Sequence, residues 1–158
     1  MATKTRTAGH TMIQPDVRFN SLLVTKFINC LMHDGKKATA TRIFYDAMEL
    51  IKKKMPDVDP VQVFNDAINN VKPSLEVRSR RVGGANYQVP MQVKPTRQQS
   101  LSIRWILGAI RAKSGRPTYQ RLADELMAAS RREGEAMAKR EQTVKMADAN
   151  KAFSHFAW

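Results

Sequence analysis

The amino-acid sequence predicts a mainly α-helical protein, a bundle of about six helices with a two-stranded β-hairpin that projects between the third and fourth helices. Two observations lead to this fold class. Apolar residues recur at helical spacing over most of the chain, whereas residues 74–94 are rich in Val, Tyr and Gln and contain a Gly-Gly pair typical of a hairpin. The 158 residues, of which 42% are hydrophobic, suffice for one domain with its own core.

The first three helices have clear ends. The first is expected over residues 21–33, and the second over residues 37–54, where it finishes in three lysines that favour the negative end of the helix dipole. Asp59 is expected to cap the third helix, with Pro60 at its first position, and this helix continues to Val71. Three helices therefore precede the hairpin.

The loop of the hairpin can be predicted from the strand pattern. Residues that face each other in an antiparallel pair lie on the same side of the ribbon. Pairing Val77 with Met91 gathers the apolar residues on one side and the polar residues on the other. This pairing requires an odd loop, most simply Gly83, Gly84 and Ala85. We therefore expect a three-residue loop, an apolar root that docks on the helices, and a tip that projects.

Three further helices follow the hairpin. Thr96 is expected to cap the fourth helix, which runs to about Lys113, and Thr118 is expected to cap the fifth. A sixth helix, more polar than the others, should run from about residue 133 or 135 past Ala147. Its polarity predicts that it is less buried than the other five.

The overall charge indicates the class of partner. The formal net charge is +13, from 27 Lys and Arg against 14 Asp and Glu. Such an excess repels itself in the folded state, so we expect a polyanionic partner, and nucleic acid in particular. No window approaches the roughly 18 apolar residues of a membrane span. The single cysteine, Cys30, cannot form an intrachain disulfide and lies among apolar residues, which predicts a core thiol in a reducing compartment.

We expect the chain to divide into a basic N-terminal arm, residues 1–20, and a single helical RNA-binding domain, residues 21–158, which includes the hairpin at 74–94. The arm contains Lys4 and Arg6 but no apolar core of the length that a signal peptide needs. A transit peptide to an organelle is an open alternative, because the arm is rich in threonine and poor in acid. We favour an arm that becomes ordered on RNA.

The positive charge is concentrated in one part of the chain. Residues 77–123 contain no acid, and Arg97, Arg104 and Arg111 repeat every seven residues, which places them in one stripe on the fourth helix. Helix faces exposed to water usually mix both signs, so this stripe favours contact with RNA phosphates over a merely solvated face. The basic residues of the acid-free stretch are Arg78, Arg80, Arg81, Lys94, Arg97, Arg104, Arg111, Lys113, Arg116 and Arg121.

Aromatic and amide side chains accompany the basic residues of the hairpin. Tyr87 and Gln88 follow the loop, opposite the basic run that begins at Arg78. This mixture suits an RNA groove or a single-stranded loop, with guanidinium on phosphate and the ring on a base. The alternative is a short polar ribbon packed on its own protein.

Other chemistry finds little support. His10, His33 and His155 have no metal-ligand spacing with one another or with Cys30, so no metal site is predicted. Paired carboxylates and a phosphate-binding loop are missing, and we expect neither an enzyme nor a cofactor. A DNA-architectural protein is a rival, but its arm would carry an apolar wedge where this tip has Gly-Gly-Ala-Asn. An RNA-modifying enzyme would need a cofactor loop or paired acids.

Several segments resemble one known family. Residues 79–90, SRRVGGANYQVP, resemble the hairpin of small-subunit ribosomal protein seven in its bacterial form. The residues MHDGKK at 32–37 resemble the turn between that family's first two helices, and Arg104-Trp105 matches its fourth helix. Residues 139–158 resemble its C-terminal helix. The resemblance extends from about Pro15 to the end of the chain and is weakest in the arm, where bacterial members often carry an arginine cluster.

The resemblance implies a structural, non-enzymatic protein that binds small-subunit ribosomal RNA early and organises its 3′ domain, the head. It also implies a cytoplasmic ribosome, with an organellar origin left open, and a position near exit-site tRNA, the mRNA exit path and small-subunit proteins nine and eleven. The residues expected to bind ribosomal RNA are Lys4, Arg6, Lys36, Lys37, Arg78, Arg80, Arg81, Tyr87, Lys94, Arg97, Arg104, Arg111, Lys113 and Arg116. Those expected to face tRNA are Gly83, Gly84, Ala85, Asn86, Lys139 and Arg140.

Overall fold

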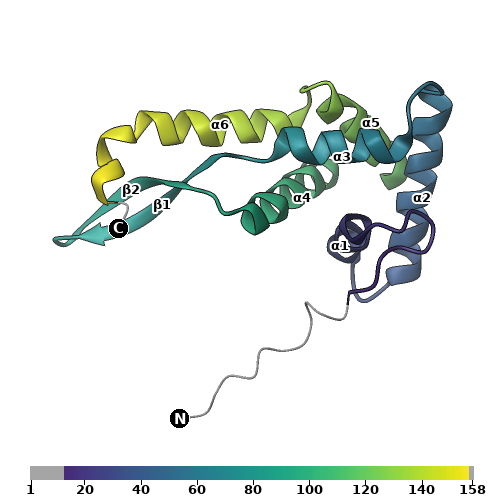
Figure 1. Cartoon of the computed structure of the whole chain (residues 1–158), viewed down its shortest axis with the longest axis horizontal. Helices are drawn as coiled ribbons and strands as arrows, with labels where there is room; N and C mark the ends of the chain where they lie inside the picture. Colours follow the sequence, from purple (N-terminus) through teal and green to yellow (C-terminus); the bar gives the residue numbers. More distant parts are fainter. Residues whose placement is uncertain (1–12, 157–158) are drawn as a thin grey trace, which may run out of the picture.

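The computed structural model describes residues 13–156 and has the predicted mainly helical architecture (Figure 1). In chain order the elements are α1 (Leu22–Leu31), α2 (Lys37–Lys54), α3 (Pro60–Val71), β1 (Leu75–Val82), β2 (Ala85–Gln92), α4 (Pro95–Ala112), α5 (Thr118–Ser130), α6 (Glu135–Ala149) and the 3-10 helix η2 (Lys151–Phe156). The two antiparallel strands lie between α3 and α4, as predicted. Within the described residues, no helix is long and apolar enough to cross a membrane.

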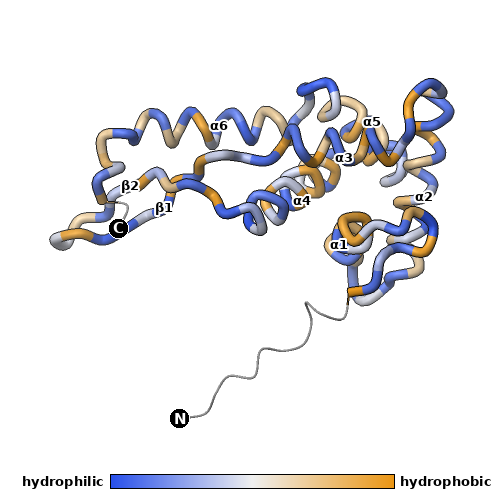
Figure 2. The backbone as a smooth tube through the Cα atoms, in the orientation of Figure 1, coloured by the Kyte–Doolittle hydropathy of each residue, from blue (hydrophilic) through white to orange (hydrophobic). Residues whose placement is uncertain are grey.

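The core of the bundle is built around three phenylalanine rings. Phe27 of α1, Phe44 of α2 and Phe64 of α3 are fully buried, and their ring centroids lie 5.3 to 5.7 Å apart. Tilted and edge-to-face aromatic pairs of this kind add about 0.5–1.5 kcal/mol to the burial of their area. In Figure 2 the helices alternate hydrophobic and hydrophilic segments, as expected for helices with one buried face.

The sixth helix connects the bundle to the hairpin. Ala136 and Met137, in its first turn, belong to the same hydrophobic cluster as the rings. The rest of α6 leaves the bundle and runs alongside β1 and β2, and η2 then contacts β2 (Figure 1). The predicted limits of the sixth helix are confirmed. The sequence pattern did not predict η2 or its packing on the hairpin.

Some predicted helix ends are confirmed and others are wrong. The Asp59 side chain accepts a hydrogen bond from the backbone N–H of Val61 at 3.1 Å, which confirms it as the cap of α3. By contrast, Thr96 and Thr118 lie inside their helices, because α4 begins at Pro95 and α5 begins at Thr118 itself. Pro95 explains the first error, since its fixed φ is already helical and starts the helix one residue earlier.

The hairpin register differs from the prediction. Val77 pairs with Pro90 rather than Met91, and the loop has two residues, Gly83 and Gly84, instead of three. Both glycines have positive φ, +58° and +87°. A two-residue turn of this kind requires positive φ at both positions and matches the twist of the strands, and two glycines supply it without strain. The predicted register is wrong because the ribbon does not have a single apolar side.

The register has a direct consequence for the faces of the ribbon. It places Arg80 opposite Tyr87 and Arg78 opposite Val89, so basic and apolar residues share one face. Val89 and Val93 are buried, which confirms an apolar root, and Gly83 to Asn86 are exposed at the tip. The polar and apolar residues are therefore not sorted onto opposite sides, as the three-residue loop would have required.

Cys30 is also a correction. The predicted core thiol is exposed in the last turn of α1. At about 100° per residue, Cys30 lies about 120° around the helix from the buried Val24, away from the face that packs on the core. Helical spacing suggests burial because Cys30 follows Phe27 by three positions and Leu23 by seven, but Leu23 is itself only partly buried, so the core does not extend to this side of α1.

Candidate nucleic-acid interface

Residues 77–123 contain no Asp or Glu, but acidic residues from other parts of the chain lie beside them in the folded structure. Glu76, Asp124, Glu125 and Glu135 lie outside this stretch in sequence, and each pairs with a basic residue within it. The ten basic residues therefore divide into those that hold the fold together and those that remain available to a ligand.

Glu76 binds two of the predicted RNA-binding arginines. Its side chain is 9% exposed and lies 2.8 Å from Nε of Arg78 and 2.7 Å from Nε of Arg97. The Arg97 contact joins the first turn of α4 to the root of β1. Each contact uses Nε, one of the five N–H donors of an arginine. Arg78 and Arg97 thus fix the hairpin against α4 while remaining half exposed.

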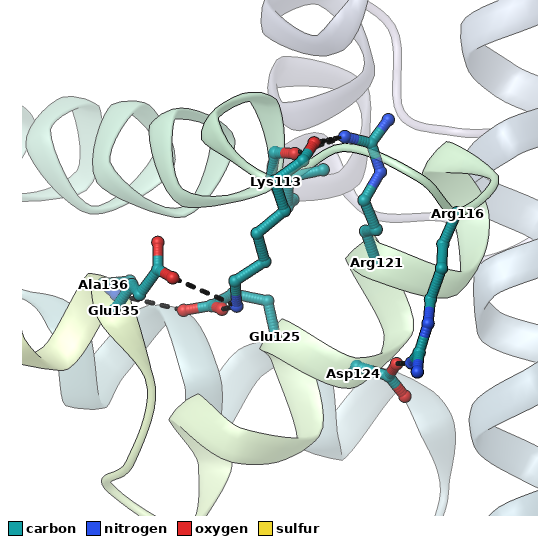
Figure 3. Close-up of polar contacts among 8 residues, drawn as sticks. Lys113, Arg116, Arg121, Asp124, Glu125, Glu135 and Ala136 are labelled. Atoms are coloured by element: carbon teal, nitrogen blue, oxygen red, sulfur yellow. Dashed lines mark hydrogen bonds and ion pairs between the residues drawn. The ribbon is translucent and has the colours of Figure 1, made fainter.

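Glu125 holds Lys113 in the same way (Figure 3). The carboxylate is 1% exposed, accepts a hydrogen bond from the Lys113 ammonium at 2.9 Å and another from the backbone N–H of Ala136 at 3.0 Å. Glu135 lies 3.6 Å from the same ammonium. The hydrogen bond to Glu125 is the main cause of a raised pKa for Lys113. Lys113 therefore joins the end of α4 to α5 and the start of α6.

The turn after α4 is stabilised by a further arginine that is not among the predicted site residues. Arg121 donates from Nη1 to the carbonyls of Ile110, at 2.9 Å, and Lys113, and from Nη2 to Thr118 Oγ1 at 3.1 Å. The carbonyls of Ile110 and Lys113 lie at the end of α4, where backbone carbonyls have no partner inside the helix. Arg116 is only loosely held, 3.6 Å from Asp124 and 71% exposed (Figure 3).

A smaller set of basic residues remains open to a ligand. Arg81, Lys94 and Arg104 are exposed and make no hydrogen bond or ion pair through their side chains with any residue in the described range 13–156. Arg111 is exposed and donates only to the Cys30 carbonyl, at 3.3 Å, within that same range. Gly108 leaves the backbone between Arg104 and Arg111 open, since an added Cβ would meet nothing within 4 Å.

Lys139, which is predicted to face tRNA, lies close to the exposed Arg104 of α4. Lys139 and Arg104 line a shallow groove of about 310 Å³ between α4 and α6, together with Trp105. Arg140, the next residue on α6, is partly buried, and its Nε has no partner within the part of the chain that the structure describes. Lys139 therefore faces outward beside α4, whereas the Arg140 stem packs inward.

The turn between α1 and α2 lies beside the turn between α4 and α5. His33, Arg111 and Arg121 line one cavity of about 290 Å³. Lys36 and Lys37 are exposed in the same α1–α2 turn. Two basic turns that are far apart in sequence thus lie on the same side of the bundle.

Two predicted RNA-binding residues of the hairpin contact the protein itself. The Tyr87 ring lies 5.3 Å from Phe153 and 5.1 Å from Phe156, and Arg80 Nη1 donates to the Phe156 carbonyl at 3.0 Å. This face of the hairpin therefore matches the alternative prediction, in which the ribbon packs on its own protein. Lys4, Arg6 and His10 lie outside the described residues.

These features define a class of protein. It is a helical protein with a localised basic face, and this face is formed by a hairpin and one helix. Among residues 13–156, no group of three potential ligands could hold a metal ion. The family model of ribosomal protein S7p/S5e matches residues 3–151, and the chain belongs to this family. It is therefore a structural constituent of the ribosome and not an enzyme.

Curated relatives agree with the family match. The chain is 60% identical over 153 residues to small ribosomal subunit protein uS7 of Rhodopirellula baltica, an alignment that covers 96% of this chain and 98% of the relative. It is 56% identical over 146 residues to the uS7 protein of a Nitratiruptor species, covering 92% of this chain and 94% of the relative. The uS7 protein of Verminephrobacter eiseniae is 56% identical over 144 residues, an alignment that covers 91% of this chain and 92% of the relative.

Proposed function

We propose that this protein is a primary binder of small-subunit ribosomal RNA that nucleates folding of the 3′ domain, the head. Residues 21–158 act as a single RNA-binding domain, and residues 1–20 as a basic arm that adds affinity. The observation that carries the proposal is the group of exposed basic residues on the hairpin, on α4 and at the junction between them that have no acidic partner among residues 13–156, namely Arg81, Lys94, Arg104 and Arg111.

The proposed mechanism is phosphate neutralisation by a surface that is already in place. Glu76 and Glu125 hold Arg97 and Lys113 at the two ends of α4, so the row between them is presented on a rigid helix. Phosphate contacts fix register and carry no base code, so the shape of the folded RNA selects the partner. Lys36, Lys37, Arg78 and Arg116 extend the same surface toward the RNA.

The wider partners belong to the same proposal. The exposed tip residues Gly83 to Asn86 and the outward Lys139 would face exit-site tRNA near the mRNA exit path, with Arg140 supporting them from its inward position. Small-subunit proteins nine and eleven would be neighbours. A bacterial-type ribosomal component of this kind works in the cytoplasm, and relatives of bacterial origin support that location.

The salt dependence of RNA binding tests the proposal. Arg104→Ala and Arg111→Ala should each reduce the slope of log affinity against log salt by about 0.7 to 0.9 for each phosphate contact that is lost. Lys53→Ala, which removes an equal charge from the exposed end of α2, is the matched control and should leave the slope nearly unchanged. An unchanged slope for both arginine variants would refute an RNA-facing α4.

A competition experiment distinguishes this function from that of a DNA-architectural protein. Small-subunit ribosomal RNA fragments from the head should displace the protein from duplex DNA at equal nucleotide concentration. If duplex DNA instead displaced the protein from ribosomal RNA, this outcome would contradict the ribosomal RNA assignment. The basic surface would then bind polyanions without regard to their fold.

A further inference from the structure

The hairpin is a two-stranded ribbon that extends beyond the bundle, and an isolated ribbon of this kind is at best marginally stable in water. A surface that binds RNA through such a ribbon needs something to hold it. Glu76 and Arg97 secure its root, at the first residues of β1, and the end of α6 lines a cavity with Leu75 and Met91 in the same half of the ribbon. The distal half, from Ser79 to Gln88, requires a second support.

That support comes from the end of the chain. Phe153 and Phe156 of η2 pack their rings on Tyr87, and the Phe156 carbonyl accepts a hydrogen bond from Arg80. Arg80 and Tyr87 are paired across the two strands, so η2 contacts both strands at the same rung. This rung lies three residues from each glycine of the turn, in the half of the ribbon that the bundle does not reach.

Within the described part of the chain, the contacts of η2 show no role in the bundle. None of the six residues of η2 is buried, and none belongs to the hydrophobic core. Its contacts are with β2, with the end of α6 and, through Arg80, with β1. Its two phenylalanines therefore pack on the hairpin and not on the core of the bundle.

We propose that η2 is a brace for the hairpin: Phe153 and Phe156, acting through Tyr87 and Arg80, hold the distal half of the ribbon in its RNA-binding orientation before RNA is present. Phe153 and Phe156 are positioning residues, and Tyr87 works inward, on the brace, instead of stacking on a base. The RNA part of this inference rests on the proposed function. The structural part, that Phe153 and Phe156 hold the distal half of the hairpin, does not depend on the proposed function.

The physical benefit is preorganisation. A ribbon that is free to move must lose that freedom when it binds, and the lost freedom weakens the affinity. Two aromatic pairs of this geometry correspond to a shift of about tenfold in the equilibrium between a held and a free hairpin. The brace would therefore raise RNA affinity by about tenfold without adding a phosphate contact.

Amide hydrogen exchange of the free protein tests the brace without RNA. In the full chain, the double variant Phe153→Ala/Phe156→Ala should exchange the amides of β1 and β2 near Arg80 and Tyr87 about tenfold faster than wild type. Phe153→Tyr/Phe156→Tyr, which keeps both rings, should restore slow exchange. The amides of α3 should be unchanged in both variants, since α3 packs in the separate core. Unchanged exchange in the hairpin would overturn the proposal.

RNA binding provides the second measurement. The double alanine variant should bind head-domain ribosomal RNA about tenfold more weakly, with an unchanged salt slope because no charge is lost. Lys151→Ala, on the same segment, removes a charge and keeps the rings, and it should leave hairpin exchange unchanged. Faster exchange with unchanged affinity would refute the role of the brace in binding.

Truncation separates the brace from the opposite arrangement, in which η2 covers Tyr87 and leaves when RNA stacks on the ring. Removing residues 151–158 should weaken RNA binding if η2 is a brace, whereas it should strengthen binding if η2 is a cover. Tighter binding would overturn the proposal. If the wild-type protein itself failed to bind ribosomal RNA, the proposed function would fall, while the exchange experiment would still decide the brace.

Discussion

The buried carboxylate of Glu125 lies 2.9 Å from the ammonium of Lys113, twelve positions away in sequence. The same carboxylate accepts the backbone N–H of Ala136 at the start of α6. One side chain thus joins α5, the end of α4 and the start of α6, and α6 is the helix that runs along the hairpin. This junction therefore ties the start of α6 to α5 and to the end of α4 at the point where α6 leaves the bundle.

Replacing Glu125 should therefore destabilise the protein. Glu125→Gln keeps an acceptor for the Ala136 N–H but loses the charge that binds Lys113, and we expect the free energy of unfolding to fall by about 1–3 kcal/mol. Urea denaturation measures the change. Glu135→Gln is the control, because Glu135 is 55% exposed and 3.6 Å from Lys113, and its loss should cost less than about 1 kcal/mol. Equal losses for the two variants would contradict the role assigned to Glu125.

Gly134 is the position where this junction tolerates no side chain. It has φ +95°, and an added Cβ would lie 2.9 Å from Oε1 of Glu125. Gly134→Ala should lower the free energy of unfolding by about 1–3 kcal/mol, through backbone strain and through displacement of the carboxylate. Gly115→Ala is a matched control, since Gly115 has φ +86° and open space around it, so it measures the backbone cost alone. Thermal unfolding that is the same in both variants would show that the Glu125 contact is unimportant.

Glu76 makes a different kind of prediction, a loss of stability without a loss of RNA binding at low salt. Glu76→Gln releases Arg78 and Arg97 from their shared carboxylate and should lower the free energy of unfolding by about 1–3 kcal/mol. At low salt the variant should bind ribosomal RNA at least as tightly as wild type. Its salt slope should be steeper by about 0.7 to 0.9 for each freed arginine that takes a phosphate.

The control for Glu76 is Asp66→Asn on the exposed surface of α3, which changes the net charge by the same amount. A salt titration of both variants compares them directly. If Asp66→Asn steepened the slope as much as Glu76→Gln, the effect would come from total charge and not from the two released arginines.

Tyr45 makes stability depend on alkaline pH. Its pKa is raised above the ordinary 10.0, mainly by burial and next by the hydrogen bond that its hydroxyl donates to Asp16 at 2.9 Å. Because the folded protein holds this proton more strongly than the unfolded chain, the stabilisation is complete below about pH 10 and is lost as the pH rises through the raised pKa.

The comparison with Tyr45→Phe isolates this effect. The variant lacks the hydroxyl, so its free energy of unfolding should fall less than that of wild type between about pH 9 and pH 11. Lys113, whose pKa is also raised, contributes equally to both proteins. Urea denaturation across this range measures the difference, and parallel curves for the two proteins would contradict the raised pKa of Tyr45.

The sequence predicts the helices well because their signals are local. Apolar spacing, the lysines at the end of α2 and the cap at Asp59 each act within one or two turns, and the structure confirms them. The hairpin is located correctly but its predicted register is wrong, since the choice between two and three loop residues depends on what covers the ribbon. The prediction for Cys30 fails for a similar reason: spacing places Cys30 near Leu23 and Phe27 on α1 but does not show how far around the helix the core extends.

Local patterns are sufficient to establish a helical protein with a basic hairpin and a basic fourth helix, and the sequence motifs identify the ribosomal family. Which basic residues are free depends on the packing of the whole chain. Glu76, Glu125 and the Phe156 carbonyl reach Arg97, Lys113 and Arg80 from distant parts of the sequence. Ion pairs and hydrogen bonds depend on distance in space, which residue order does not show, so a run of arginines without acids in sequence contains both structural and exposed charges.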